Sequence, residues 1–199
     1  MEIFTGALER EGDYERLEMD HLDLSGQDAR EARLVDCALH HCTLDGARLG
    51  GARLVDTSFV EVRADVLDVP DAEWRDVTLT DCRLGAVRAF GGDLVRVTVV
   101  GGKIDYLNLR DATIRELRIV GATVDDLDLA GATVRELVVQ DSRVPRLDVT
   151  GARFTDTDLR GADLSHIDGL AGLAGTTISE EQLAALAPLL AAHLGVVVR

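Results

Sequence analysis

Apolar residues recur at every fifth position over three quarters of the chain, from Tyr14 to Leu164. All 31 positions of this series are apolar or aromatic, and a second, mostly small series lies two residues before each of them. Neither series contains a charged residue, although 29% of the chain is charged. This regularity indicates that both series are buried and that every repeat contributes to one continuous core.

A period of five excludes one long helix and one flat sheet. Five residues advance a helix by about 500°, so the apolar positions would drift around its surface. In a strand, an odd step sends successive members to opposite faces. Only a chain that bends in step with the repeat keeps both series inside. The pattern therefore predicts a solenoid whose coils are hydrogen-bonded to one another.

The repeat resembles that of the pentapeptide-repeat proteins, whose motif is A(D/N)LXX. Residues 162–166 read Ala-Asp-Leu-Ser-His and match in full, whereas residues 47–51 read Ala-Arg-Leu-Gly-Gly and match both inward positions. The resemblance implies an all-β fold, a right-handed quadrilateral β-helix with four repeats per coil. On that basis residues 14–168 form nearly eight coils, about 35–40 Å long at the spacing of β-strands.

The small inward series supports four sides per coil independently. From residue 77 onward it alternates large and small residues, as in Val77 and Cys82 or Leu117 and Ala122. A period of ten places large residues on two opposite sides of a narrow core and small ones on the other two, which fills the core efficiently. Two irregular places, near Pro70 and Phe90, are expected to bulge or loop, with Phe90 turned inward.

Both ends are expected to cover the open core. Residues 1–13 form an N-terminal cap with Ile3, Phe4 and Leu8 over the first coil. Residues 169–199 contain a glycine-rich linker over 169–175, a helix and a short strand over 196–198. Ser179 with Gln182 forms a capping box, Pro188 is expected to kink or split the helix, and Gly195 to stop it.

The apolar residues of that helix have two interpretations, a cap on the last coil or an interface between two copies. Related proteins dimerise through a C-terminal helical segment. The resemblance therefore implies a homodimer, with the interface residues Leu183, Leu186, Leu190 and Leu194.

Charge narrows the classes of partner. The formal net charge is −15, from 36 acidic and 21 basic residues, which argues against direct binding of nucleic acid and favours a basic protein partner. No run of about 18 apolar residues is present, so no membrane segment is expected. The first twelve residues lack the basic and apolar regions of a secretory signal, and we expect a cytoplasmic protein.

Residues 20 apart are expected to stack on one face, which gives two acidic columns as candidate partner-binding sites. The first column comprises Asp36, Asp56, Asp76, Glu116, Glu136 and Asp156, with Arg96 among them. The second comprises Asp28, Asp68, Asp128, Asp148 and Asp168, with Asp111 beside it. The first column is either a solvated face neutralised by neighbouring arginines or a negative line presented to a basic groove. The second column has fewer compensating bases and is the better candidate for function, but its aspartates also occupy the preferred polar position of the motif. A third, apolar column of Val60, Val100 and Val120 reflects strand propensity or a contact patch.

Catalytic chemistry is not indicated. Cys37, Cys42 and Cys82 fall at small inward positions, whereas His40 and His41 point outward, so the Cys-His-His-Cys string cannot converge on one metal ion. There is no outward-facing cysteine, elbow serine or glycine-rich phosphate loop. We therefore expect no enzyme, no metal and no cofactor.

Within the family, the chain looks most like the Qnr quinolone-resistance proteins and their mycobacterial counterpart, which are dimeric acidic rods that bind DNA gyrase or topoisomerase IV. The leading hypothesis is a DNA-mimicking protein that binds such an enzyme and modulates it or gives resistance to a topoisomerase poison. The Qnr branch needs protruding loops for drug protection, and no phase-breaking loop is expected here. The rival hypothesis is a scaffold whose valine column binds an unrelated protein.

Overall fold

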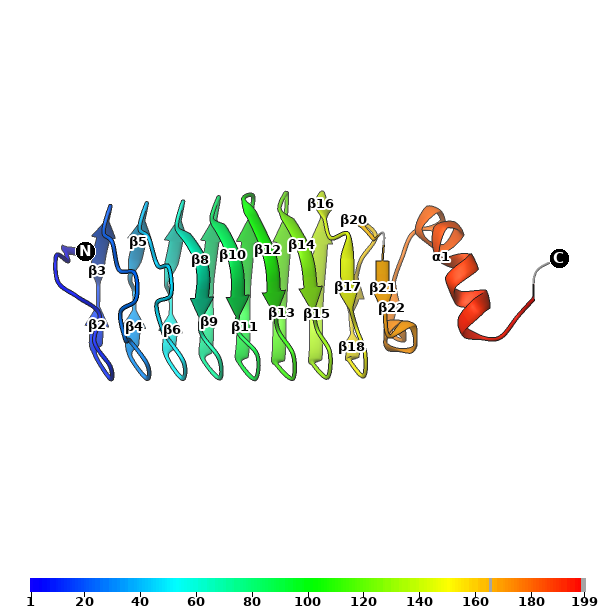
Figure 1. Ribbon diagram of the computed structural model, residues 1–199, viewed down its shortest axis with the longest axis horizontal. Coiled ribbons are helices and arrows are strands. Elements are labelled where there is room, and N and C mark those ends of the chain that lie inside the picture. The colour runs from blue at the N-terminus through cyan, green and yellow to red at the C-terminus, as the bar shows by residue number, and fades with distance from the viewer. Residues whose placement is uncertain (165, 198–199) are drawn as a thin grey trace.

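The computed structural model describes residues 1–164 and 166–197 and consists mainly of short parallel strands stacked into a rod. The coils follow one another along the long axis, with the N-terminus at one end and a helix at the other (Figure 1). None of the described helices is long and apolar enough to cross a membrane.

One sheet runs the length of the rod, and a second begins at Arg63 and continues toward its C-terminal end. One sheet has the order β1-β3-β5-β7-β9-β11-β13-β15-β19-β22, with β2, β4, β6 and β18 paired at its side. Its strands are β1 (Glu2–Ile3), β2 (Asp13–Glu15), β3 (Leu17–Asp20), β4 (Arg33–Val35), β5 (Ala38–His40), β6 (Arg53–Val55), β7 (Ser58–Val60), β9 (Glu73–Thr80), β11 (Asp93–Val100), β13 (Thr113–Val120), β15 (Thr133–Gln140), β18 (Arg153–Thr155), β19 (Thr157–Asp158) and β22 (Thr176–Thr177). The other sheet contains β8 (Arg63–Asp68), β10 (Arg83–Arg88), β12 (Lys103–Asn108), β14 (Thr123–Asp128), β16 (Ser142–Arg143), β17 (Arg146–Asp148), β20 (Ala162–Asp163) and β21 (His166–Asp168).

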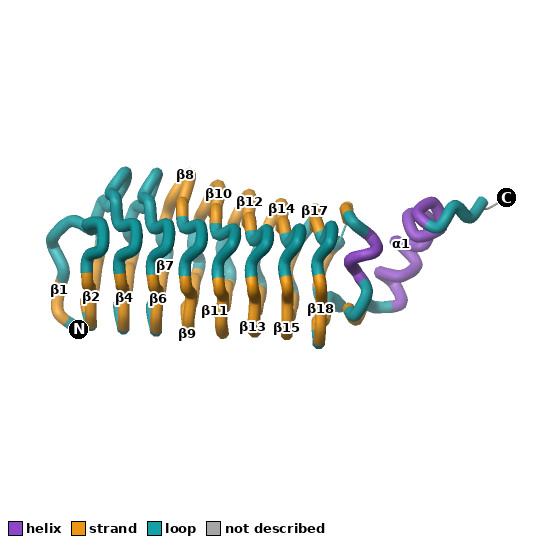
Figure 2. The backbone as a smooth tube through the Cα atoms, turned by 90° about the horizontal axis from the view of Figure 1, so that it is seen from below, coloured by secondary structure: helices purple, strands orange, loops and turns teal. Residues whose placement is uncertain are grey.

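The register confirms a coil of 20 residues. Leu34 pairs with Leu54, and Val99 with Ile119, each in a parallel ladder. Left-handed backbone recurs at five-residue steps, for example at Arg16, His21, Gly26 and Glu31 with φ between +54° and +68°. Such residues make sharp bends, and bends at every fifth residue of a 20-residue coil give it four sides. Figure 2 shows the same turns repeated from coil to coil along the rod.

The core follows the five-residue series. Of its 31 members, 30 are buried and Leu164 is half-buried. The rod is also continuous, because the coils on either side of Pro70 and Phe90 keep the 20-residue register. The expectation that Phe90 turns inward is wrong: its side chain is 40% exposed. It follows the buried Ala89 by one residue, and the unchanged phase of the repeat therefore directs it outward.

The central coils differ from the outer ones in strand length. From β8 to β15 the strands have six or eight residues, whereas the other strands have two to four. At one corner Gly26 and Gly46 are left-handed, but the equivalent Val66, Ala86 and Tyr106 lie within strands. The inward position next to this corner is Gln27 or Ala47 in the first coils and becomes Leu67, Val87 and Leu107 in the central coils. The larger side chains need more room, which is consistent with the wider, extended bend at this corner.

The N-terminal residues extend the ladder as well as capping it. Leu8 is buried, and Phe4 packs edge-on against Tyr14 with ring centroids 5.5 Å apart. Ile3, however, is 73% exposed, so the expectation that it covers the core is wrong. In β1 it pairs with Glu18, a residue between two inward positions, and its side chain therefore shares the outer face.

The C-terminal residues add a partial coil before the helix begins. The segment expected to be a linker contains a 3-10 helix, η1 (Leu170–Leu173), and β22, which pairs with β19. The helix α1 (Glu180–His193) then runs through Pro188 as one element. The segment of Val196 and Val197 is not a strand, contrary to expectation, and Val198 lies outside the described residues.

Helix α1 begins with the capping box that the sequence predicts, and the glutamine of that box also attaches the helix to the rod. Ser179 Oγ accepts from the Gln182 N–H at 3.2 Å, and Gln182 Oε1 accepts from the Ser179 N–H at 2.8 Å. Gln182 Nε2 donates to the carbonyl oxygens of Leu159 and Ala162, both at 2.7 Å. One glutamine therefore caps the helix and also satisfies carbonyl groups at the end of the solenoid.

Candidate partner-binding surface

The first acidic column occupies a sharp corner of the rod. Its members are all left-handed, with φ between +48° and +72°: Asp36, Asp56, Asp76, Arg96, Glu116, Glu136 and Asp156. Aspartate tolerates this conformation better than most residues, which gives part of the column a conformational explanation. Cations also lie in it: Arg16 is 3.7 Å from Asp36, and Arg96 Nη2 is 2.6 Å from Asp76 Oδ2. The Arg96 hydrogen bonds lower the pKa of Asp76.

The second column follows a side of the rod and alternates in sign at its N-terminal end. Asp28 is bonded to Arg30 at 2.6 Å and lies 3.3 Å from Arg48 in the next coil. Asp68 is likewise 3.2 Å from Arg88. The Arg30 hydrogen bond lowers the pKa of Asp28. This half of the column is therefore neutralised by its own arginines.

Aspartate also has a structural function in this column. The N–H two residues later donates to the Oδ1 of Asp28, Asp128 and Asp148, at 3.4, 3.1 and 2.8 Å. Asn108 makes the same bond to the N–H of Arg110 at 3.1 Å. These Asx turns satisfy a backbone donor where the strand ends, and an uncharged asparagine serves equally well. At these four residues the side-chain oxygen, and not the charge, makes the bond, whereas Arg48 and Arg88 occupy the equivalent position without it.

Asp128 is the most structural of the candidate residues. It is 6% exposed and accepts a hydrogen bond from the Tyr106 hydroxyl at 2.9 Å. Arg110 lies 3.6 Å from the same carboxylate. Burial, followed by the bond to Asp128, raises the pKa of Tyr106 to about 12. Asp128 therefore contributes negative potential from beneath the surface and is poorly placed for direct contact with a partner.

Carboxylates accumulate at the C-terminal end of this column. Asp128 pairs in register with Asp148, and Asp148 with Asp168. Asp126 lies beside them on β14, and Arg146 is 3.7 Å from it. Burial first, and then the charges of the other three carboxylates, raise the pKa of Asp126 against the opposing effect of Arg146. We call Asp126, Asp128, Asp148 and Asp168 the acidic cluster.

Asp126 is absent from the two columns inferred from the sequence. It lies two residues before Asp128 and 20 before Arg146, a position shared along the rod by Val66, Ala86 and Tyr106. A column with a single acid gives no signal by itself. The short string Asp125-Asp126-Leu127-Asp128 was the available clue, because it places three carboxylates on one coil.

Asp111 is exposed and lies at another left-handed corner, with φ +55°. In the next coil the equivalent residue is Gly131, and the Asp111 carboxylate lies over its backbone. Asp71 and Gly91 repeat this arrangement two coils earlier. Asp111 therefore has a packing role as well as a surface charge.

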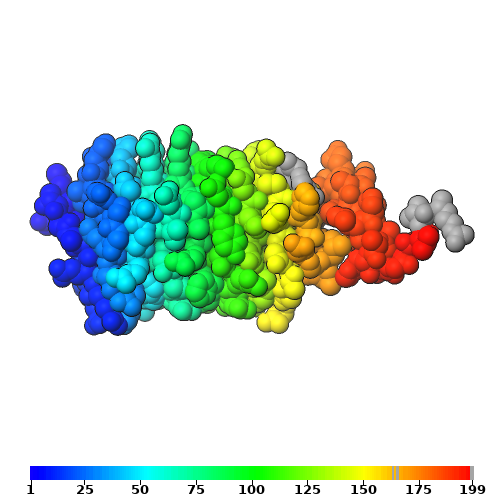
Figure 3. Space-filling view, in the orientation of Figure 1, coloured from blue at the N-terminus to red at the C-terminus, as the bar shows by residue number. Residues whose placement is uncertain are grey.

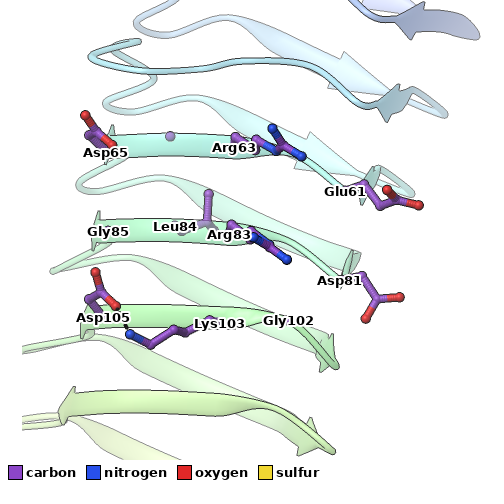
Figure 4. A pocket seen from close by; sticks show the side chains of 11 residues that line it. Glu61, Arg63, Asp65, Asp81, Arg83, Leu84, Gly85, Gly102, Lys103 and Asp105 are labelled. Atoms are coloured by element: carbon purple, nitrogen blue, oxygen red, sulfur yellow. Dashed lines mark ion pairs between the residues drawn. The ribbon is translucent and has the colours of Figure 1, made fainter.

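A hollow on the face of β8, β10 and β12 carries both signs of charge (Figure 4). Arg63, Arg83 and Lys103 stack along it, between the carboxylates of Glu61 and Asp81 on one side and Asp65 and Asp105 on the other. Lys103 Nζ is 2.7 Å from Asp105 and 2.9 Å from Asp125. Gly85 deepens the hollow because a Cβ there would collide with the Asp65 carbonyl oxygen. This face is balanced in charge, unlike the acidic cluster.

The remaining candidates divide between exposed and buried positions. Val60 and Val120 are half-buried, and Val100 is 38% exposed in the same register. On α1, Leu186 is buried and Leu190 packs against the core, whereas Leu183 and Leu194 are 51% and 73% exposed. The helix projects from the end of the rod (Figure 3). Leu186 is thus occupied within its own chain, and the exposed set at this end is Leu183, Leu189 and Leu194.

The cysteines are buried, as their positions in the repeat predict. The thiol of Cys82 donates to the carbonyl oxygens of Phe59 and Thr80 at 3.5 Å, and burial raises its pKa to about 11. A thiol in this state is a poor nucleophile and metal ligand.

Comparisons with known proteins agree on the repeat. A family model described as Pentapeptide repeats matches eight copies, in residues 18–63 and 145–168. The unmatched middle of the rod nearly coincides with the long strands β8 to β15. No curated protein matches the chain.

Similar solved structures include a trypsin-treated form of QnrB1, described as a plasmid-mediated fluoroquinolone resistance protein. It is 17% identical, with a TM-score of 0.39 over 99% of this chain and 98% of that one. HetL, a pentapeptide repeat protein involved in heterocyst differentiation regulation from the cyanobacterium Nostoc, is 21% identical. Its TM-score is 0.26 over 80% of this chain and 91% of that one. Scores this low carry no inference about partners. Residues 18–63 and 145–168 therefore carry the pentapeptide repeat, and the five-residue core series and the 20-residue register continue through the residues between them.

Proposed function

We propose that the rod binds the DNA-binding surface of DNA gyrase or topoisomerase IV in place of DNA and has no catalytic activity of its own. The observation that carries the proposal is the acidic cluster, in which Asp128, Asp148 and Asp168 stack in consecutive coils. Carboxylates spaced by one coil repel one another. A basic partner surface relieves this repulsion and gains charge-assisted contacts.

The charge density of the rod is compatible with mimicry of a nucleic acid. Residues 14–168 contain 30 acidic and 19 basic residues. Nearly eight coils at about 4.8 Å each span about 38 Å. The net charge is therefore about 0.3 per ångström, half of the roughly 0.6 per ångström of B-DNA.

The resemblance of the repeat to the gyrase-binding branch of the family selects the enzyme to test first. The described coils contain no protruding loop, and that branch uses loops for drug protection. We therefore infer that the protein inhibits or modulates its target more readily than it rescues the target from a quinolone. A cytoplasmic location and a homodimer through the exposed leucines of α1 belong to the same proposal.

A gyrase supercoiling assay tests it, with and without a fluoroquinolone, at two salt concentrations. We expect inhibition by micromolar protein that weakens as salt rises, because counterions compete for the basic surface. Asp148→Asn with Asp168→Asn should abolish the inhibition, since asparagine keeps the Asx turn at position 148 but removes both charges. The matched control, Asp36→Asn with Asp56→Asn, should leave it intact. No inhibition, or inhibition that ignores salt, contradicts the proposal.

The alternative is an interaction scaffold with an unrelated partner, favoured by the exposure of Val100 within the valine column. Changing Val100 to Thr keeps a β-branched side chain while it reduces the apolar contact area. Under the alternative this variant loses its partner, whereas the double asparagine variant keeps it. Under DNA mimicry the outcome is reversed.

A further inference from the structure

Three side chains with metal-binding atoms meet at a corner of the first two complete coils. Asp20 ends β3, and His21 and His41 follow β3 and β5 at equivalent positions one coil apart. Asp20 Oδ1 lies 2.7 Å from Nδ1 of His21 and 3.2 Å from Nδ1 of His41. The two imidazole rings stack with centroids 4.5 Å apart and planes 22° from parallel. One donor atom from each residue lies within 4.8 Å of the other two.

The backbone fixes this convergence. Both histidines are left-handed, with φ of +54° and +53°. The N–H of His21 donates to the carbonyl of His40, and that of His41 to the carbonyl of Val60, each at 2.9 Å. Because both residues occupy the same corner of the ladder, their side chains leave the rod in the same direction. The repeat therefore sets the spacing of the imidazoles.

A fourth side chain continues the line. Glu61 occupies the same corner one coil further, with φ +52°, and its Oε1 is 3.7 Å from His41 Nε2. A histidine that binds a metal through one nitrogen usually gives the N–H of the other to a carboxylate or carbonyl. With Nδ1 facing Asp20 and Nε2 facing Glu61, His41 has the arrangement of such a ligand and its orienting partner.

We propose that Asp20, His21 and His41 bind a divalent transition metal ion of the zinc class, with Glu61 orienting His41. Ligand atoms about 2.1 Å from a tetrahedral zinc ion lie about 3.4 Å from one another. The two Asp–His distances are slightly shorter, so an expansion of less than about 1 Å accommodates the ion. One oxygen and two imidazole nitrogens suit zinc, copper or nickel, and the remaining position is open to water.

The inward cysteines have no part in the site, because the thiol of Cys42 donates to the backbone carbonyls of Met19 and His40. The register excludes His40 and His41 as metal ligands together with Cys37 and Cys42, whereas His21, the residue that does meet His41, lies 20 residues before it and outside that string.

Calorimetric titration of the tag-free protein with Zn²⁺ at neutral pH tests the proposal, with Co²⁺ absorption as a second readout of coordination. We expect one ion per chain. His21→Asn and His41→Asn should abolish binding, because asparagine tolerates the left-handed backbone but removes the imidazole. Glu61→Gln should weaken binding about 10–100-fold, the usual effect of losing an orienting partner.

The matched control is His40→Asn, which removes a neighbouring imidazole whose ring centroid is 6.4 Å from that of His41. It should bind Zn²⁺ like the unmodified protein. Absence of Zn²⁺ binding by the unmodified protein overturns the proposal, and so does undiminished binding by His21→Asn. Circular dichroism of each variant shows whether the rod remains folded, so a loss of ligand can be separated from a loss of structure.

Discussion

The carboxylate of Asp111 covers the backbone of Gly131, in the position where any other residue would have its Cβ. Both residues are left-handed and occupy equivalent corners of successive coils, with φ of +55° and +72°. In this orientation the Asp111 carboxylate occupies the space that a Cβ at residue 131 would need. Asp71 with Gly91 and Asp81 with Gly101 repeat the arrangement, whereas Asp36 and Asp56 stack at their own corner without a glycine.

This relationship predicts unequal effects for two glycine substitutions. Gly131→Ala should destabilise the rod by about 1–2 kcal/mol, because the left-handed backbone is strained and the Asp111 carboxylate must rotate away from the new Cβ. Gly121 also has a left-handed backbone, with φ +62°, but a Cβ there would have open space around it. Gly121→Ala should therefore lower the free energy of unfolding by only about 1 kcal/mol. Urea denaturation measures both. Adding Asp111→Ala to Gly131→Ala should recover part of the lost free energy of unfolding. If the effects of the two substitutions simply add, the two residues are not in contact and the prediction fails.

Removal of the Asp126 charge should stabilise the protein at neutral pH. The pKa of Asp126 is raised in the folded state, so the folded form favours the protonated acid, and stability falls as pH rises through that pKa. Asp126→Asn should therefore gain on the order of 0.5 kcal/mol at pH 7. The gain should vanish below the ordinary aspartate pKa of about 3.9, where both proteins are uncharged at this position. Thermal unfolding at the two pH values provides the measurement, and a less stable variant at pH 7 would refute the expectation.

Tyr106→Phe should destabilise the rod by about 1–2 kcal/mol, because buried Asp128 loses a hydrogen bond and gains nothing. The difference in stability between the two proteins also changes at alkaline pH. The pKa of Tyr106 is raised to about 12, so stability that is fully present below about pH 10 declines as the pH approaches 12. The phenylalanine variant should lack this decline. Denaturant midpoints measured between pH 8 and pH 11 distinguish the original protein from Tyr106→Phe. The same dependence of the midpoint on pH in both proteins would contradict the prediction.

Gln182→Ala should release helix α1 from the rod without unfolding the coils. The change leaves the carbonyl oxygens of Leu159 and Ala162 without their side-chain donor and removes the capping box. We expect the C-terminal segment to lose about 1–2 kcal/mol of local stability. Hydrogen exchange should quicken in α1 but remain slow in β9 to β15. Glu180→Ala, at an exposed position of the same turn, is the control and should exchange like the original protein.

The sequence predicts the core and register of the rod closely. An uncharged residue at every fifth position is explained only if all of these residues are buried inside a regular coil. The errors of the sequence-based prediction concern residues that do not lie at the inward positions of the repeat. Ile3 is apolar but pairs with the outer residue Glu18, and Phe90 follows an inward position by one residue. Hydrophobicity alone predicted burial in both cases, whereas backbone phase decides it.

The charge columns were predicted as lines of stacked residues, but their electrostatic character was not. Neutralisation depends on whether an arginine two or 20 residues away bends toward the carboxylate, as Arg30 and Arg48 do at Asp28. The burial of Asp128 depends likewise on Tyr106, a partner in the preceding coil. Such rotamer choices lie outside a periodic pattern. The meeting of His21 with His41 lies within it, because the two residues are 20 apart and occupy equivalent corners of successive coils.

The 20-residue coil restricts how the gene can change length. Deletion of five codons keeps the hydrophobic phase of the inward positions, although it exchanges the sides on which large and small inward residues lie. Yet everything beyond the deletion turns by one side of the square, which separates Asp148 from Asp128 and divides the acidic face between two directions. Only a gain or loss of 20 codons preserves both the interior and the exterior, and it alters the length of the rod by about 4.8 Å. Selection for a surface would thus be visible as insertions and deletions in steps of whole coils, whereas selection for folding alone would permit steps of five.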